Sequence, residues 1–395
     1  MCSFAESDPT TYVADWKAFA KEIDDTYPFF DLKNIRADWN TAKPQLEEHA
    51  KACTTDAAFL GLIIDAFRVL RDSHMSLSDT QTPLPQPEPE YCPRITFMPA
   101  TDHRVIVMTV DPNLSPDLKV GTIILRIDGD DAYTHLEKQV QKNWETMFAS
   151  SFQRARLYAY RIPLRGKQGE SHIIHYLVDG EEKEITVTNN AEARGWPHVY
   201  NMPEPLTRFG RSFLYGTLES GVGYMYLRRV DQSVTEGMKE ALDKHKDVKG
   251  WVVDLRGNGG GGYDQALLDM VKSVPKPVAV IIDAGCISAG ETLARDFAEL
   301  AEARLFGSTT AGASSSKRQW KFPSGIATVS LPTRSRWRAD GKPIEFNGIE
   351  PDEVVEPDPA EVLAGKNSEL LRAEAYVLKR SNGDESGAAA GAAAR

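Results

Sequence analysis

The chain has 395 residues, of which 41% are apolar and 26% charged, and its formal net charge is −11. This composition is typical of a globular protein with a sizeable core, and its acidic balance argues against nucleic-acid binding and mildly favours basic or unfolded polypeptide substrates. No apolar run approaches the ~20 residues of a membrane span, and no cysteine or histidine cluster has the spacing of a zinc site.

Residues 1–80 are expected to form a helical domain. Within it, the apolar residues of 56–70 recur at steps of three and four, which predicts a helix that begins after Thr54 or Thr55. Ser73 and His74 follow the end of this helix, so a loop can place the imidazole in a cleft. A proline-rich connector from about residue 83 to 93 then predicts a domain boundary.

Short strand patterns dominate the next two segments. Residues 90–146 are expected to form a β domain that ends in a helix, and residues 147–220 a β-rich connector. The Asp179-Gly180 dipeptide lies between two alternating runs, which predicts a β-hairpin.

The pattern changes to β-α-β over residues 221–357, which predicts an α/β layered core. Strands are expected at 223–229, 250–255, 278–283 and from 305, and helices after the capping-box pair Ser233 and Glu236, near 263, and at 289–301. Residues 358–395 are expected to form a C-terminal helix and a flexible Gly/Ala-rich tail.

A glycine-rich loop follows the strand that ends near residue 255. The run Asp254-Leu-Arg-Gly-Asn-Gly-Gly-Gly-Gly262 is costly in conformational entropy, so its backbone is expected to approach a ligand or a developing negative charge closely. Two other interpretations stay open: a flexible turn, or a dinucleotide fingerprint, since Gly257, Gly259 and Gly262 spell G-x-G-x-x-G.

The second chemical segment is Asp283-Ala-Gly-Cys-Ile-Ser-Ala-Gly-Glu291, at another strand-to-helix junction. Ser288 is expected at a helix N-terminus, where the dipole and free N–H groups favour negative charge. Ser288 is either a nucleophile or an ordinary N-cap. Cys286 is a conceivable nucleophile, although a small buried apolar residue is the simpler interpretation.

Together these segments resemble the carboxyl-terminal processing (tail-specific) serine peptidases, a family that includes the tricorn core protease and the repeats of interphotoreceptor retinoid-binding protein. The resemblance covers roughly residues 10–357 in the family's order. The motifs that carry it are Leu70–His74, a PDZ-like stretch at 105–131, Asp254–Gly260, Gly285–Glu291 and Gly348-Ile-Glu-Pro-Asp352. The implied fold is α/β, with a crotonase/ClpP-like β-α-β core, an N-terminal helical domain and an inserted PDZ-like β domain.

The resemblance also indicates a branch of the family. Tail-specific proteases use a Ser-Lys dyad, but Ala313 stands at the position of that lysine, and Lys317 lies four residues further on. The tricorn-like branch instead uses a Ser-His pair, with a second serine directly before the histidine and a glutamate before the closing Gly-x-x-Pro-Asp motif. Here Ser73 precedes His74, and Glu345 precedes the closing motif Gly348–Asp352.

This branch implies an endopeptidase in which Ser288 is the nucleophile, His74 the general base, and Ser73 and Glu345 the groups that orient the base. Backbone N–H groups of Gly259, Gly260 and Ala289 are expected to hold the oxyanion. No cofactor or metal is required; the expected partner is a polypeptide substrate, and a homo-oligomer stays open. The alternatives are a catalytically silent protein of the same fold that binds peptides or apolar ligands, and a crotonase-like acyl-CoA enzyme.

The compartment is left open by the sequence. The first residues show no signal-peptide pattern, and Met1-Cys2 is compatible with the first mature cysteine of a lipoprotein or with a plain cytosolic N-terminus. An extracytoplasmic location, periplasmic or lipoprotein-anchored, is slightly favoured over a cytoplasmic one.

Overall fold

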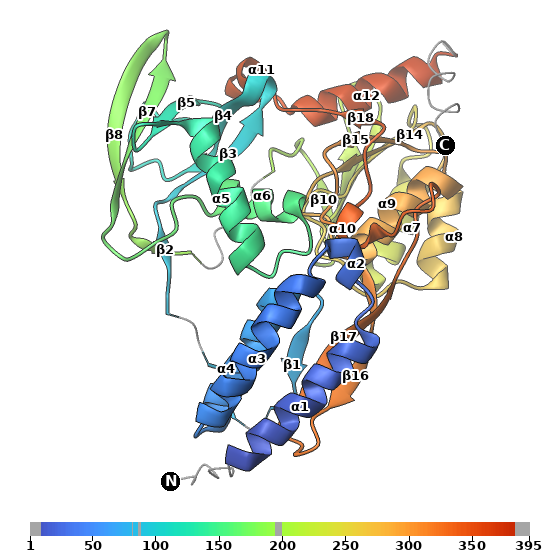
Figure 1. Cartoon of the computed structure of the whole chain (residues 1–395). Coiled ribbons are helices and arrows are strands. Elements are labelled where there is room, and N and C mark those ends of the chain that lie inside the picture. The colour runs from blue at the N-terminus through green and yellow to red at the C-terminus, as the bar shows by residue number, and fades with distance from the viewer. Residues whose placement is uncertain (1–8, 81, 86–87, 194–199, 384–395) are drawn as a thin grey trace.

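A computed structural model describes residues 9–80, 82–85, 88–193 and 200–383 of the chain. Cys2 and the end of the Gly/Ala-rich tail lie outside the described residues, so the expectations about them stay expectations. Figure 1 shows the N-terminal helices at one end of the molecule, and a β unit and an α/β unit side by side at the other.

The first unit is helical, as expected, with α1 (Pro9–Thr26), α2 (Phe30–Lys33), α3 (Arg36–Ala52) and α4 (Asp56–Leu70). The bounds predicted for α4 are confirmed. Oγ1 of Thr55 accepts a hydrogen bond from the Ala58 N–H and so caps the helix, and Arg71 ends it with a left-handed φ of 47°. The Ser73-His74 turn follows directly.

Strands from two other regions complete the core of this helical unit. The hairpin of β16 (Ser315–Lys321) and β17 (Thr328–Ser335) pairs with β1 (Ser76–Ser78) in a three-stranded sheet. Phe322 and Val329 of this hairpin region are buried in the same cluster as Trp16, Phe19 and Phe67. Figure 1 shows the orange hairpin beside the blue helices. The turn that carries His74 is therefore held against a segment that extends from the α/β unit.

The second unit is a sheet in the order β3-β4-β5-β7-β8, with β6 paired to β5. Its strands are β3 (Ile95–Ala100), β4 (Arg104–Val110), β5 (Ile123–Ile127), β6 (Asp130–Asp131), β7 (Ser171–Val178) and β8 (Glu181–Thr188). The 3-10 turn η1 (Thr101–His103) and helices α5 (Ala132–Thr146) and α6 (Phe152–Arg161) belong to it, and β2 (Tyr91–Cys92) pairs with β9 (Ala191–Glu192). The hairpin predicted at Asp179-Gly180 is confirmed. β7 and β8, which were expected in a separate connector, continue this sheet because β7 pairs with β5.

The third unit contains a seven-stranded sheet in the order β10-β11-β12-β13-β14-β15-β18. Its strands are β10 (Thr207–Phe209), β11 (Phe213–Thr217), β12 (Gly223–Leu227), β13 (Trp251–Asp254), β14 (Val278–Ile282), β15 (Arg304–Gly307) and β18 (Glu353–Val354). The strands from β12 to β18 are parallel, whereas β10, β11 and β12 pair antiparallel. This arrangement confirms the predicted α/β core.

Helices cover both faces of the large sheet. α7 (Gln232–Lys244), α8 (Gln265–Ser273) and α9 (Ala289–Leu300) share an apolar cluster with one face, and α12 (Ser368–Ser381) with the other. Two short helices, α10 (Ile344–Asn347) and α11 (Pro359–Leu363), lie in the segments between. The cap predicted for α7 is wrong: the Asp231 carboxylate, not Ser233, accepts the N–H of the first turn.

Candidate active site

Two loops meet where β13 and β14 end. The Asp283 carboxylate accepts N–H bonds from Gly257 at 2.8 Å and Gly285 at 2.9 Å, and so joins the glycine loop to the loop that carries Ser288. A backbone bond of 2.9 Å from the Ile287 N–H to the Asn258 carbonyl joins them again. Since the carboxyl ends of neighbouring parallel strands share one edge of the sheet, the two chemical segments are brought together there.

Ser288 stands at the start of α9 in a strained backbone conformation, with φ 56° and ψ −121°. A positive φ in a non-glycine residue persists only where its surroundings enforce it, and such strain clusters at functional sites. Here the Ser288 N–H donates to the Ala313 carbonyl at 2.8 Å and to the Glu291 carboxylate at 3.2 Å. The predicted position of Ser288 at a helix N-terminus is confirmed.

Gly260 makes the close approach that the glycine run predicted. Its φ is 68°, and a Cβ atom there would lie 2.8 Å from Cβ of Ser288 and 2.9 Å from the Ile287 carbonyl oxygen. Any side chain would displace Ser288 or strain the loop.

The three expected oxyanion donors differ in availability. The Gly260 N–H donates to Oδ1 of Asn258 at 2.9 Å, and the Gly259 N–H to the Arg228 carbonyl at 2.9 Å. Both therefore already have acceptors, in contrast with the expectation that they face an oxyanion. Ala289 is the first residue of α9, so its N–H is one of the donors that a helix leaves without an intrahelical acceptor.

His74 and Ser288 line the same cavity, although more than 200 residues separate them in sequence. The cavity measures about 1110 Å³, and Gly259, Gly261 and Lys317 also line it. The His74 N–H donates to Oδ1 of Asp72 at 2.9 Å, which fixes the turn. On the ring, Nδ1 is buried and has no hydrogen-bond partner among the described residues.

Burial, helped by the positive charges of Lys317 and Lys33 and opposed by Asp72, lowers the pKa of His74 to about 4. A neutral imidazole is the form that can accept a proton. The electrostatics therefore keep the His74 imidazole neutral at neutral pH.

Glu345 is fully buried, but its nearest charged partner is Lys33 rather than His74. The Lys33 ammonium lies 2.8 Å from Oε1 of Glu345 and 3.3 Å from Oδ2 of Asp72, and all three side chains are inaccessible. Oε2 of Glu345 accepts the Ser314 N–H at 2.8 Å. Burial raises the pKa of Glu345 to about 7, although the Lys33 charge opposes this. The expected link from Glu345 to His74 thus runs through Lys33 and Asp72.

Ser73 is exposed, and its contact is with another serine. Its Oγ lies 2.9 Å from Oγ of Ser150, which also accepts the Ser73 N–H at 3.1 Å. This contact anchors the His74 turn to the segment between α5 and α6.

The other candidate nucleophile, Cys286, is buried, and the other candidate base, Lys317, is exposed. Burial raises the pKa of the Cys286 thiol well above its usual range, which fits a small buried apolar residue rather than a nucleophile. Lys317 lies on β16 with an exposed side chain, in the same cavity wall as Ser288 and His74. No group of three or more potential metal-ligating residues occurs in the described part of the chain.

The sequence profile of peptidase family S41 matches residues 221–275 and 268–355. The α/β core is therefore similar to the core of peptidase family S41. A carboxy-terminal processing protease, CtpA of Bacillus subtilis (strain 168), is 26% identical over 174 residues, which are 36% of this chain and 37% of that protein. The match therefore spans little more than a third of that relative's length.

Two solved structures share the fold of this chain over 95% of its length. Mature CPAF, in a complex with lactacystin, is 14% identical, with a TM-score of 0.65 over 95% of this chain and 99% of that one. The tricorn protease is 15% identical, with a TM-score of 0.50 over 95% of this chain and 37% of that one. The fold class and the family resemblance predicted from the motifs are confirmed. No helix among the described residues is both long and apolar enough to cross a bilayer.

No role was predicted from the sequence for three buried polar residues of the site: Lys33, Asp72 and Glu291. Glu291 is fully buried and accepts bonds from the Thr310 hydroxyl at 2.6 Å and the Gly312 N–H at 2.8 Å, and burial raises its pKa to about 8. The Ser288-x-x-Glu291 spacing is a capping-box signature that could have revealed it. No sequence pattern around Lys33 predicts its burial or its role.

Proposed function

We propose that the chain is a serine endopeptidase in which Ser288 attacks the scissile peptide carbonyl and His74 accepts the serine proton. The observation that supports this proposal is that a strained Ser288, at a helix N-terminus, and a neutral His74 line the same cavity. A serine hydroxyl needs such a base before it becomes a useful nucleophile.

In the proposed reaction the Ser288 Oγ–C bond forms as the carbonyl becomes an oxyanion. The Ala289 N–H and the positive end of α9 stabilise that charge. Gly260 lies against Ser288, and for its N–H to contribute it must divide its donation between Oδ1 of Asn258 and the oxyanion. His74 then donates its proton to the leaving amine, and water hydrolyses the acyl-enzyme.

Ser73, Lys33 and Glu345 are positioning residues in this proposal. Lys33 links the Glu345 carboxylate to Asp72, and Asp72 holds the His74 N–H. Ser73 holds the same turn through Ser150. Because the base comes from the helical unit and the nucleophile from the α/β unit, their docking determines the distance for proton transfer.

A fluorophosphonate probe tests the proposal, because it bonds covalently to an activated serine. We expect the folded protein to be labelled, Ser288→Ala to lose labelling, and Ser381→Ala, a change at an exposed serine of α12, to retain it. We expect the parent protein and Ser381→Ala to hydrolyse an unfolded protein substrate, and Ser288→Ala to have lost this activity. Absence of labelling in folded protein would contradict the proposal and favour a silent binding protein.

A further inference from the structure

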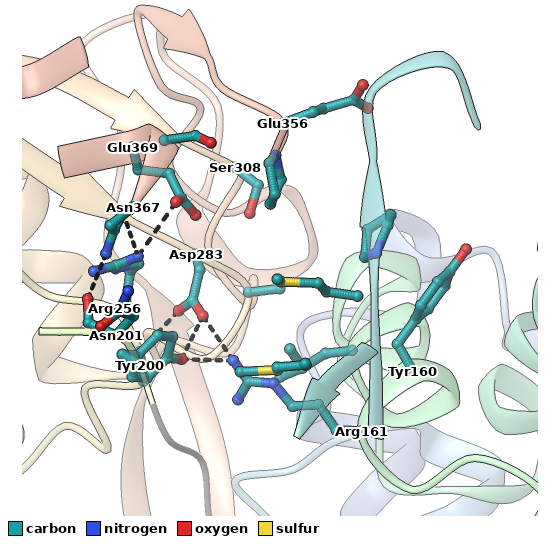
Figure 2. A pocket seen from close by; sticks show the side chains of 18 of the residues that line it. Tyr160, Arg161, Tyr200, Asn201, Arg256, Asp283, Ser308, Glu356, Asn367 and Glu369 are labelled. Carbon is teal, nitrogen blue, oxygen red and sulfur yellow. Dashed lines mark hydrogen bonds and ion pairs between the residues drawn. The ribbon is translucent and has the colours of Figure 1, made fainter. Parts of the chain in front are cut away.

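A second cavity, of about 1870 Å³, lies between the β unit and the large sheet (Figure 2). Residues of β3, α5 and α6 line one side, and residues of β10 to β12 and the segment before α12 line the other. This volume exceeds the roughly 300–1,000 Å³ of ordinary small-molecule pockets. The space therefore suits a polypeptide segment.

Two arginines inside this cavity are neutralised by partners within the protein. Arg161 donates to the Asp283 carboxylate at 2.9 Å, and Arg256 lies 3.4 Å from the Glu369 carboxylate. Figure 2 shows both pairs, with Tyr200 joined to the first and Asn367 to the second. Arg161 thus joins α6 of the β unit to the α/β unit, Arg256 is paired within the α/β unit, and neither offers the cavity much free charge.

Three further arginines line the cavity: Arg208, Arg211 and Arg228. Their side chains are exposed, and they have no ion pair within the described part of the chain. The other unpaired charges in the wall balance one another, since they are Lys119, Lys366, Glu204 and Glu356. The three arginines therefore leave a positive excess in a chain whose net charge is −11.

Strand pairing gathers these arginines at one end of the sheet. Arg208 on β10 is opposite Leu214 on β11, which is opposite Tyr226 on β12, and opposed residues share a face. Arg228 follows Tyr226 by two positions, and its N–H donates to the carbonyl of Ser212, next to Arg211, at 2.8 Å. Leu214 and Tyr226 also line the cavity, so the positive charges border an apolar floor.

The positive charge continues to the catalytic cavity. Arg229 is exposed and lines that cavity together with Ser288 and His74, whereas its neighbour Arg228 lines the larger one. Arg228 and Arg229, which directly follow β12, thus place one positive charge in each cavity. A ligand that bridges the two would meet arginines along its path.

We propose that the larger cavity binds an acidic segment of the polypeptide substrate, with Arg208, Arg211 and Arg228 as its counter-charges and Arg229 beside the scissile region. The inference rests on the proposed function, because it names the substrate class of that same centre. It differs from the preference for basic substrates that the net charge favours, since local charge at the cavity is opposite to the charge of the whole chain.

Binding is measured in the Ser288→Ala variant, which separates recognition from hydrolysis. The probes are a fluorescein-labelled peptide with a run of glutamates and its glutamine counterpart, followed by fluorescence anisotropy. The test variant carries Arg208→Gln, Arg211→Gln and Arg228→Gln. The control is Arg372→Gln, which removes an exposed arginine of α12 outside both cavities.

We expect the glutamate peptide to bind more tightly than the glutamine peptide, with affinity that falls as salt rises. The triple variant should bind it roughly tenfold more weakly, and Arg372→Gln should not change the Kd. Equal binding of the two peptides, an unaffected triple variant, or stronger binding of oligonucleotide than of the glutamate peptide overturns the inference. Absence of fluorophosphonate labelling in the folded parent protein, in contrast, would overturn the proposed function and leave these binding data intact.

Discussion

The Lys33 ammonium lies 2.8 Å from the Glu345 carboxylate, with both side chains inaccessible to solvent, and so connects the N-terminal helices to the α/β unit. Lys33 ends α2, whereas Glu345 belongs to the short α10 segment that precedes the closing motif. Asp72, the second carboxylate at Lys33, holds the backbone of the proposed base. This ion pair therefore couples the stability of the domain contact to the geometry of the site.

Lys33→Met is expected to destabilise the protein by ~3–5 kcal/mol, because it leaves buried carboxylates without their positive partner. Denaturant unfolding measures the loss. Lys21→Met, at an exposed ion pair with Asp25, is the matched control and should change stability by ~1 kcal/mol or less. The double variant Lys33→Met/Glu345→Gln should lose less than the sum of its single changes; strict additivity would argue against the coupling.

His74→Ala is expected to lower the rate of fluorophosphonate labelling and of peptide hydrolysis by roughly 10²–10⁴-fold, because the serine then has no base. Lys317→Met is the comparison, since Lys317 lines the same cavity wall. We expect that variant to keep most of the activity. If Lys317→Met abolished labelling and His74→Ala did not, the lysine would be the base and the branch assignment would fail.

The acid limit of activity is expected near pH 4 rather than near 6.5, because His74 must be neutral and its pKa in the folded protein is lowered to about 4. The rate of labelling as a function of pH measures this limit. The same shift affects stability: the contribution of His74 is present above pH 6.5 and is lost as the pH falls through 4. Removal of the Lys317 charge should move the limit to higher pH; an unchanged limit would contradict the assigned cause.

Gly260→Ala is expected to reduce labelling by more than roughly tenfold, because its Cβ would lie 2.8 Å from Cβ of Ser288 and its φ is 68°. Gly262→Ala, in the same run, is the control, because a Cβ there meets nothing within 4 Å. That variant should label at nearly the parent rate. Similar losses in the two variants would show that loop flexibility, not close approach to Ser288, explains the glycines.

The sequence by itself determined the local elements and the chemical segments. Periodicity and capping predicted α4 and α9 because amphipathic spacing and a helix start are properties of a few neighbouring residues. The Asp179-Gly180 hairpin and the β-α-β alternation were predictable for the same reason. The motif order indicated the family because its residues are read one after another along the chain.

Only the tertiary structure decided what those segments contact. Lys33 resembles a surface lysine in sequence, and its burial between Asp72 and Glu345 depends on residues far apart in the chain. The acceptors of the Gly259 and Gly260 N–H groups and the excess of arginines in the larger cavity likewise follow from strand pairing and domain docking. Burial and electrostatic surroundings are set by segments that meet only in the folded chain, so a local pattern does not determine them.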